Sequence, residues 1–290
     1  MISFIRNIWK NRSTKFFIIL SVVFIFVIAL AAYVIKNAGY FIHKKTVYVV
    51  KIDDVISYKY MDIDKLSNFL ENFKGDGLIL YIDSPGGGLE TFKIVQAIKN
   101  LSVPKVCYIK YYGTSAAYWI CSQADYIVAE PYAITGSIGG VIMYMNFAGL
   151  LRKIGVEPVI IKEGRLKDLG NPYRNLTEHE KEILHRKLKI FVDKFKNDVL
   201  NKRNIHNRSA VLSGEWFFGI EAKELGLVDN LGDYETAKNI IAEELNTSKN
   251  DIAFVEISFK KEELWISKIF GMVLDFILKR SIENLYGVLG

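Results

Sequence analysis

The sequence predicts an α/β fold with a largely parallel sheet, because short apolar β-rich runs alternate along it with helix-like segments. The β-rich runs are TVYVVKI (46–52), GLILYID (77–83), VCYIKYY (106–112), YIVAE (126–130) and PVIIKEG (158–164). The helix-like segments lie at about 62–73, 89–101, 115–123 and 144–154. The runs are too apolar to leave one face in water, so we expect helices on both faces of the sheet. Functional side chains should then gather on the loops that leave the carboxyl ends of the strands.

A longer helix should begin at Thr177. Thr177 and Glu180 have the spacing of a capping box, in which each side chain binds the other residue's backbone amide. Apolar residues recur at helical spacing on one face of this helix, namely Leu184, Leu188, Phe191, Phe195 and Val199. The opposite face is charged and carries His179 and His185, whose spacing does not fit a zinc-binding helix.

The length and composition suit one large domain or two small ones with a core that folds without disulfide or metal support, since 50% of the 290 residues are apolar. The net charge of +6 is uneven, because residues 1–52 carry +8 and the rest therefore carries −2. This distribution excludes a basic nucleic-acid footprint on the globular part. An external location would permit a disulfide between the only cysteines, Cys107 and Cys121. We nevertheless expect two buried free thiols, because nothing in the sequence brings their backbones close.

An apolar stretch near the N-terminus predicts a membrane anchor. Residues 16–35 contain no charged side chain and match the length of a helix that crosses a hydrocarbon core of ~30 Å. A cleaved signal peptide is the alternative, although its apolar region usually has only ~7–15 residues. Basic residues are more numerous before the stretch than after it, so we expect residues 1–15 in the cytoplasm and the rest of the chain outside.

A second amphipathic segment lies near the C-terminus. Residues 264–280 place apolar side chains on roughly one side of a helix, interrupted by Lys268, Asp275 and Lys279. Such a helix can pack on the core, meet another subunit or lie in a membrane interface. We rank packing or assembly above membrane contact.

Three predicted strand-end loops carry residues suited to catalysis. The loop YIDSPGGGLE (81–90) has glycines that let a substrate backbone approach and leave amide groups free to bind an oxyanion. In GTSAAYWICSQAD (113–125), Ser115 stands where a strand meets a helix, either as a nucleophile or as an ordinary helix cap. The loop EGRLKDLGNPYR (163–174) contains Lys167. Without a catalytic role, the first loop would be an ordinary turn, and Lys167 in the third loop would be an ordinary solvated lysine.

A serine nucleophile needs a base, and the histidines are poorly placed to supply it. His43 follows the apolar stretch, His179 and His185 lie on a charged helix face, and His206 is in a polar segment. None of them follows a predicted strand. Lys167 is therefore the best-placed candidate base, provided that burial favours its neutral amine.

Together these motifs resemble the signal peptide peptidase A family of membrane-anchored Ser/Lys proteases, whose fold is similar to Clp protease and crotonase, a ββα superhelix. The resemblance runs from about Thr46 to Ala237. It rests on the order and spacing of DSPGGG (83–88), SAAYWI (115–120), ADYIVA (124–129), TGSIG (135–139), KDLGNP (167–172) and SGEWFFGIEAKELGLVD (213–229).

The resemblance implies a role for each site residue. Ser115 corresponds to the nucleophile and Lys167 to the general base, while Ser137 corresponds to the serine that orients the lysine. The oxyanion would bind the amide of Gly86 or Gly87 together with that of Ala116. No cofactor and no metal are implied.

The chain departs from the family in two respects. After the nucleophile the family usually has Gly-Gly-Tyr, whereas Ala116, Ala117 and Tyr118 follow Ser115 here, which adds two methyl groups to the site wall. The chain is also a half-length form with one serine and one lysine motif. In the family such forms resemble rings in which serine and lysine meet across neighbouring subunits, so we expect a homo-oligomer.

The resulting expectation is a membrane-anchored serine endopeptidase. Residues 1–15 form a cytoplasmic basic segment, 16–35 the anchor, 36–45 a linker, 46–245 the protease domain outside the cytoplasm, and 246–290 a C-terminal extension. Its partners would be peptides or membrane proteins with apolar segments, such as cleaved signal peptides. A related protease that trims stomatin-like membrane proteins and a catalytically silent membrane scaffold are the alternatives. A coenzyme A enzyme fits an external domain poorly.

Overall fold

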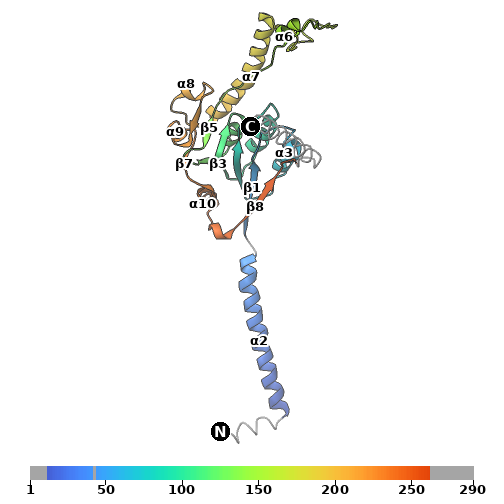
Figure 1. Cartoon of the computed structure of the whole chain (residues 1–290). Helices are drawn as coiled ribbons and strands as arrows, with labels where there is room; N and C mark the ends of the chain where they lie inside the picture. The colour runs from blue at the N-terminus through green and yellow to red at the C-terminus, as the bar shows by residue number, and fades with distance from the viewer. Residues whose placement is uncertain (1–11, 42–43, 262–290) are drawn as a thin grey trace, which may run out of the picture.

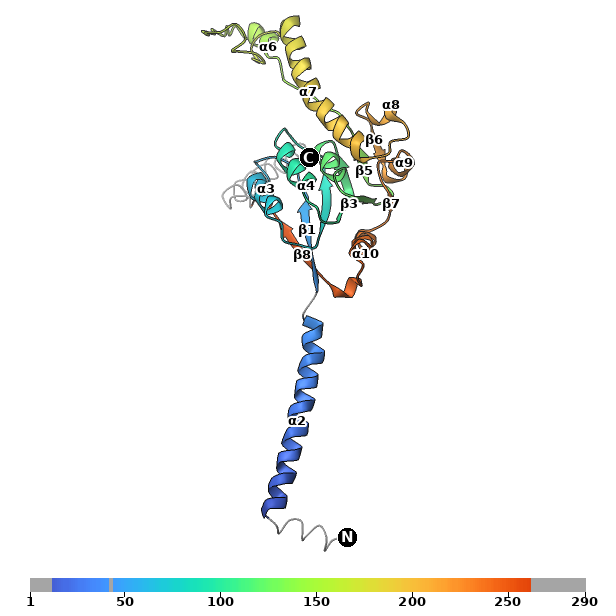
Figure 2. The same ribbon diagram turned by 180° about the vertical axis from the view of Figure 1, so that it is seen from behind.

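The computed structural model describes residues 12–41 and 44–261. It shows an α/β body with a projection at each of two opposite ends (Figure 1). The first projection is helix α2 (Arg12–Phe41). The second, which we call the arm, comprises residues 141–184, with α6 (Ala148–Lys153) and the N-terminal part of α7 (Glu178–Lys202). Figure 2 shows the same arrangement from behind.

The body is built on an eight-stranded sheet with the strand order β6-β5-β3-β2-β1-β8, while β4 pairs with β3 and β7 outside this path. The pairings in the sheet are parallel except for the antiparallel pair β5–β6. The strands are β1 (Lys45–Ile52), β2 (Gly77–Ser84), β3 (Lys105–Thr114), β4 (Tyr126–Ala129), β5 (Ile134–Gly136), β6 (Trp216–Phe218), β7 (Asn230–Leu231) and β8 (Ile252–Ser258).

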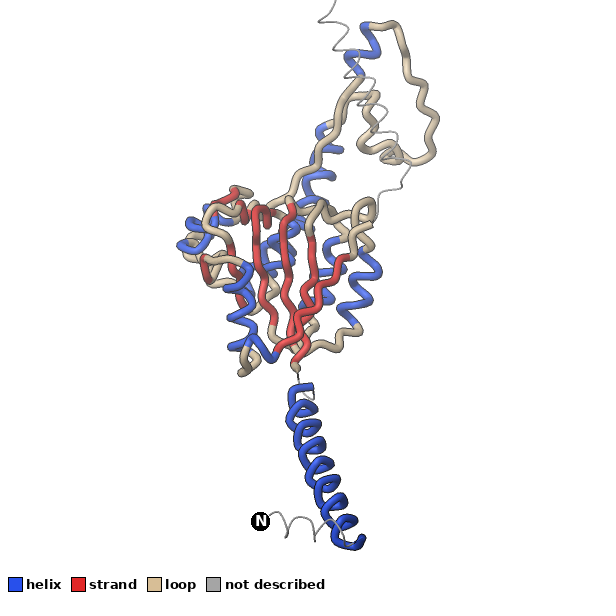
Figure 3. The backbone as a smooth tube through the Cα atoms, turned by 60° about the horizontal axis from the view of Figure 1, so that its bottom comes forward, coloured by secondary structure: helices blue, strands red, loops and turns tan. Residues whose placement is uncertain are grey.

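Helices cover both faces of this sheet (Figure 3). Val50 and Leu80 point into one core, which they share with α3, α4, α5 and the C-terminal part of α7. Val49 and Ile79 point into the other core, which α10 covers. The helices of the body are α3 (Ile63–Glu71), α4 (Thr91–Lys99), α5 (Ala116–Cys121), α8 (Arg208–Val211), α9 (Gly219–Glu224) and α10 (Tyr234–Glu244), with a 3-10 turn at Lys249–Asp251. The predicted α/β class is therefore confirmed.

Most of the predicted elements are present, and the differences concern strands. The predicted strands before residue 131 and the predicted helices before residue 155 correspond to β1–β4 and α3–α6. The strand predicted at 158–164 is wrong: the segment is a loop of the arm, where Val159 is 85% and Ile161 95% exposed and no strand of the sheet lies beside it. Strands β5 to β8 were not predicted, and β8 extends the sheet past residue 245 by pairing with β1.

Helix α7 begins as predicted, at a capping box. The Thr177 side chain accepts a hydrogen bond from the Glu180 amide, and the Glu180 side chain accepts one from the Thr177 amide. Further along, Phe195 and Val199 are buried in the core, and the Phe195 ring stacks on Trp119 with ring centroids 5.0 Å apart. The helix therefore joins the arm to the body.

Helix α2 stands apart from the sheet (Figure 1). The apolar side chains that the structure describes between Leu20 and Val34 are exposed. Among the described residues, no helix has both the length and the apolar character that a membrane crossing requires. The span expected at 16–35 is thus unconfirmed, and the amphipathic helix expected at 264–280 lies outside the described residues.

The free thiols expected at Cys107 and Cys121 are replaced by a disulfide. Cys107 lies on β3 and Cys121 ends α5, which packs back on β3. This packing brings the two Cα atoms to 5.3 Å, within the usual range for a disulfide. The expectation was wrong because the pairing depends on the packing of α5 against β3, which is a tertiary contact that the sequence did not reveal.

Candidate active site

Ser115 lies at the junction of β3 and α5, half-buried, with a backbone φ of 53°. Its amide donates to the Gly136 carbonyl at 2.8 Å, and its carbonyl accepts from the Trp119 amide at 3.0 Å. Ser115 occupies the N-cap position of α5, yet its side chain makes no capping hydrogen bond. A positive φ in a residue other than glycine costs ~1–3 kcal/mol and persists where the surroundings enforce it. The backbone is therefore fixed while the hydroxyl stays available.

Ser137 occupies the equivalent place on the neighbouring strand. It directly follows β5, has a φ of 52°, and its amide donates to the Glu215 carbonyl at 2.7 Å. Strands β3 and β5 pair in parallel, and the Thr135 hydroxyl donates to the Gly113 carbonyl at 2.8 Å. Because the two strands end side by side, Ser115 and Ser137 leave the same edge of the sheet.

The glycine-rich loop after β2 packs directly against Ser115. Gly86 has a φ of 104°, and a Cβ there would lie 2.8 Å from the Thr114 carbonyl oxygen and 2.9 Å from the Ser115 Cβ. The Thr114 hydroxyl donates to the Pro85 carbonyl at 3.0 Å, and the Ile56 amide donates to the Gly86 carbonyl at 2.9 Å. These contacts fix the loop beside the serine.

The backbone amides of Gly87 and Ala116 have no acceptor within the described part of the chain. The Gly86 amide is different, because it donates to the Ser84 hydroxyl at 3.1 Å. Ala116 is the first residue of α5, where a helix leaves its amide unbonded. Of the two glycines that the sequence left open, Gly87 therefore has the free donor.

A cleft of about 830 Å³ brings most of the candidate residues together. Gly87, Ser115, Ala116 and Ser137 all line it. The volume lies in the range usual for ligand sites, ~300–1,000 Å³. The rest of its wall includes Trp119 of α5, Ile138 of the segment after β5, and Leu188, Phe191 and Val192 of α7.

Lys167 lies elsewhere in the monomer. It sits in the arm, its side chain is exposed, and it is absent from the lining of the cleft. Its amide donates to the Gly164 carbonyl at 3.1 Å, which places it in a turn. A single chain thus brings Ser115 and Ser137 together but does not bring Lys167 to them.

The α7 wall of the cleft includes residues that we did not assign to the site from the sequence. Leu188 and Phe191 belong to the predicted apolar face of the long helix, but the sequence did not indicate that this face reaches the serine. His185, which the sequence places on the charged face of this helix, also lines the cleft. Helix periodicity could identify the face, whereas its partner depends on the tertiary fold.

Residues 97–248 match the family model described as Peptidase family S49. The chain is 31% identical over 248 residues to the putative protease MJ0651 of Methanocaldococcus jannaschii. The aligned region covers 81% of this chain and 78% of that protein. The chain belongs to peptidase family S49.

Within the S49 family, the chain is also 32% identical over 188 residues to the putative signal peptide peptidase SppA of Enterococcus faecium, covering 63% of this chain and 55% of that protein. Among solved structures, the chain is similar to that of the 1510-N membrane-bound stomatin-specific protease, a lysine-to-alanine mutant in complex with a substrate peptide. That protein is 15% identical to this chain, with a TM-score of 0.46, and the match covers 81% of this chain and 100% of that chain. The S49 chain is a serine-type peptidase of the signal peptide peptidase A group.

Proposed function

We propose that the chain is an endopeptidase in which Ser115 is the nucleophile and Lys167 of a neighbouring subunit is the general base. The observation that carries the proposal is the cleft, in which the unbonded Ser115 hydroxyl lies with the free amides of Gly87 and Ala116. A hydroxyl at a strand end beside two unpaired donors suits attack on a carbonyl and stabilisation of the oxyanion that results.

The proposed reaction has two stages. Ser115 Oγ attacks the carbonyl carbon of the scissile peptide bond while its proton passes to Lys167 Nζ, and the Gly87 and Ala116 amides bind the oxyanion. Lys167 then gives this proton to the leaving amine, and an ester joins the acyl part to Ser115. Next, Lys167 takes a proton from water, whose oxygen attacks the ester, and the proton returns to Ser115 Oγ as the acid leaves. Each oxyanion donor is typically worth ~2.7–4 kcal/mol.

The place of Lys167 on the arm supports a base that comes from another subunit. The arm carries many apolar side chains that are more than half exposed, which is unusual for a surface that stays in water. They are Val141, Met143, Met145, Leu150, Ile154, Val159 and Ile161. We propose that they pack against further copies of the chain in a homo-oligomer, and that Ser137, which lines the cleft, orients the incoming lysine.

The proposed substrates are peptides with apolar segments, such as cleaved signal peptides. Support comes from the cleft wall, where the partly exposed side chains of Leu188, Phe191 and Val192 offer apolar surface in the same cleft as Ser115. We further propose that the exposed apolar side chains of α2 attach the protein to a membrane, with the peptidase domain on the outer face. Release of the protein from membranes by alkaline carbonate would contradict this attachment.

Substitution of the two proposed catalytic residues tests the function. We expect Ser115→Ala and Lys167→Ala each to abolish cleavage of an apolar peptide without changing the size of the assembly. Matched controls are Ser213→Ala, which alters another serine of the same cleft, and Lys153→Ala, which alters another exposed lysine of the arm. Full cleavage by either proposed catalytic variant, measured by mass spectrometry of the products, would refute the proposal.

A further inference from the structure

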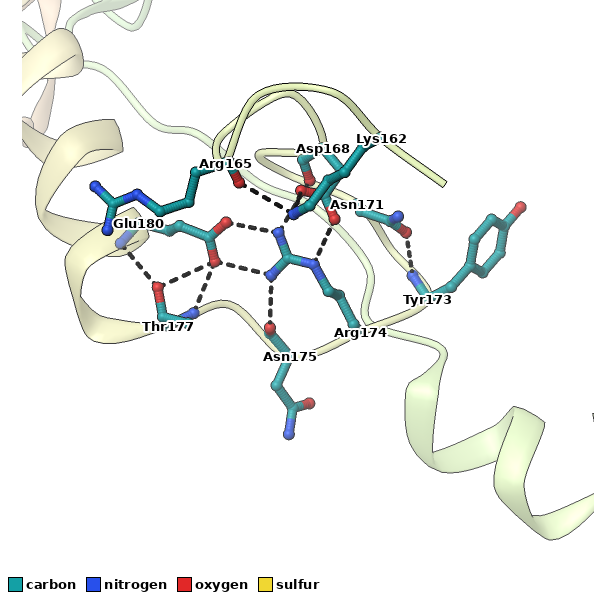
Figure 4. A network of polar contacts seen from close by, with 9 residues as sticks. All are labelled: Lys162, Arg165, Asp168, Asn171, Tyr173, Arg174, Asn175, Thr177 and Glu180. Carbon is teal, nitrogen blue, oxygen red and sulfur yellow. Dashed lines mark hydrogen bonds and ion pairs between the residues drawn. The ribbon is translucent and has the colours of Figure 1, made fainter. Parts of the chain in front are cut away.

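We propose that Arg174 is a positioning residue that holds the turn carrying Lys167 against the first turn of α7. The inference rests on the proposed role of Lys167 as the base. Figure 4 shows the contacts: the Arg174 guanidinium lies between the carboxylates of Asp168 and Glu180. Asp168 is the residue directly after Lys167, so a contact to Asp168 acts on the turn itself.

The Arg174 guanidinium uses all of its N–H groups. Nη1 and Nη2 donate to the two carboxylate oxygens of Glu180 at 2.8 and 2.6 Å, and Nε donates to Asp168 Oδ2 at 2.7 Å. Nη1 also donates to the Asn175 carbonyl at 3.1 Å, and Nη2 to the Asp168 carbonyl at 3.3 Å. A planar fork with five donors fits such an arrangement, whereas a lysine ammonium cannot bind both carboxylates in this geometry.

Arg174 and the carboxylates of Asp168 and Glu180 form what we call the clamp, and both carboxylates are themselves held in place. Glu180 is the acidic member of the α7 capping box and accepts from the Thr177 amide at 2.9 Å. Lys162 donates to Asp168, and to the Arg165 carbonyl at 3.0 Å. The side chains of Asp168 and Glu180 are only 10% and 4% exposed. The clamp therefore joins the Lys167 turn to the end of a helix that is anchored in the body.

Apart from this network, the turn has one weaker side-chain contact to α7, between Arg165 Nη2 and His179 Nε2 at 3.4 Å. Its backbone contacts are short-range, such as Lys167 N to the Gly164 carbonyl at 3.1 Å and Asn171 N to the Asp168 carbonyl at 3.0 Å. The segment before it is the exposed loop that was expected to be a strand. A strand at 158–164 would have fixed the position of the segment that leads to Lys167. In its absence, the ion pairs of Arg174 hold the turn.

The test compares Arg174→Ala and Arg174→Lys with Lys181→Ala, which breaks a different ion pair in the same helix turn, to Glu178 at 2.7 Å. Activity is expressed per active site, counted by serine-directed acylation of Ser115, and the assembly size is measured in parallel. We expect Arg174→Ala to lower kcat about 10- to 100-fold with little change in KM, because a small misplacement of a catalytic group has effects of this size.

We expect Arg174→Lys to recover part of this loss and Lys181→Ala to match the unaltered protein. Faster amide hydrogen exchange over residues 164–171 in Arg174→Ala, with the assembly intact, would show that the turn has been released. Unaltered kcat in both Arg174 variants, or a fall in activity that only follows loss of assembly, would overturn the inference. If Lys167→Ala is inactive while the Arg174 variants keep full kcat, the positioning role of Arg174 is refuted and the proposed function stands. Full activity in Lys167→Ala would instead refute the proposed function.

Discussion

At Ser115 the backbone has a positive φ of 53°, and the hydroxyl takes no part in capping the helix that the residue begins. The sequence left two interpretations open, a nucleophile or a helix cap. The unused hydroxyl favours the first, because an ordinary N-cap serine accepts a hydrogen bond from the helix. The strain is enforced by the Ser115 amide contact to Gly136 and by the packing of Gly86.

Substitution of Gly86 tests this enforced geometry. We expect Gly86→Ala to slow acylation of Ser115 strongly, because its Cβ would lie 2.8 Å from the Thr114 carbonyl oxygen and 2.9 Å from the Ser115 Cβ. The φ of 104° adds strain of ~1–3 kcal/mol to the folded state. The rate of labelling by a serine-directed probe and the thermal unfolding midpoint measure the two effects. Gly149→Ala is the control, since nothing lies within 4 Å of a Cβ there. Equal labelling rates in the two variants would contradict the enforced geometry.

At the scale of elements, the first turn of α7 depends on paired charges. The Arg174 guanidinium lowers the pKa of the Glu180 carboxyl from 4.5 to about 2 and holds the pKa of Asp168 well below its usual range. Both carboxyls have lower pKa values in the folded chain than in the unfolded chain. Their contribution to stability is therefore complete above the unfolded pKa and is lost as the pH falls through the folded value.

A carbon-13 titration of the Glu180 carboxyl measures this directly. We expect a midpoint near pH 2 in the unaltered protein and a midpoint closer to 4.5 in Arg174→Ala, because the main cause of the lowered pKa has been removed. In the unaltered protein, the local stability of the arm should fall as the pH drops from about 4.5, the ordinary pKa of this carboxyl, towards 2. A Glu180 midpoint near 4.5 in the unaltered protein would show that the pair does not persist in solution.

The elements also show what the sequence predicts and what it leaves out. The strands β1–β4 and the start of α7 follow from local signals, namely continuous apolar runs and a capping box. The run at 158–164 also has an apolar β-branched centre, but it lies on the arm, where no partner strand accepts it. The common edge of Ser115 and Ser137 follows from parallel pairing. The free donor of Gly87, the α7 wall and the Cys107 disulfide depend on tertiary contacts and could not be derived from spacing.

At the scale of the whole molecule, the cleft and the proposed base occupy different parts of the chain. Ser115 lies at the edge of the sheet, while Lys167 lies on an arm whose apolar side chains are exposed. Both features have the same explanation if arms of neighbouring subunits cover one another. An assembly would bury the apolar side chains and complete each site with a lysine from the next subunit.

Mixed assemblies separate this arrangement from a dyad within one chain. Subunits with Ser115→Ala keep Lys167, and subunits with Lys167→Ala keep Ser115, so an equal, random mixture should recover about one quarter of the unaltered activity when each site joins two subunits. A mixture of Ser115→Ala with the Ser115→Ala, Lys167→Ala double variant is the matched control, because no site in it has an intact serine. Native mass spectrometry verifies that both kinds of subunit share one assembly. If verified mixed assemblies remain inactive, the two residues must come from one chain, and the arm would have to fold back onto its own cleft, which is a rearrangement of α7 rather than a contact between subunits.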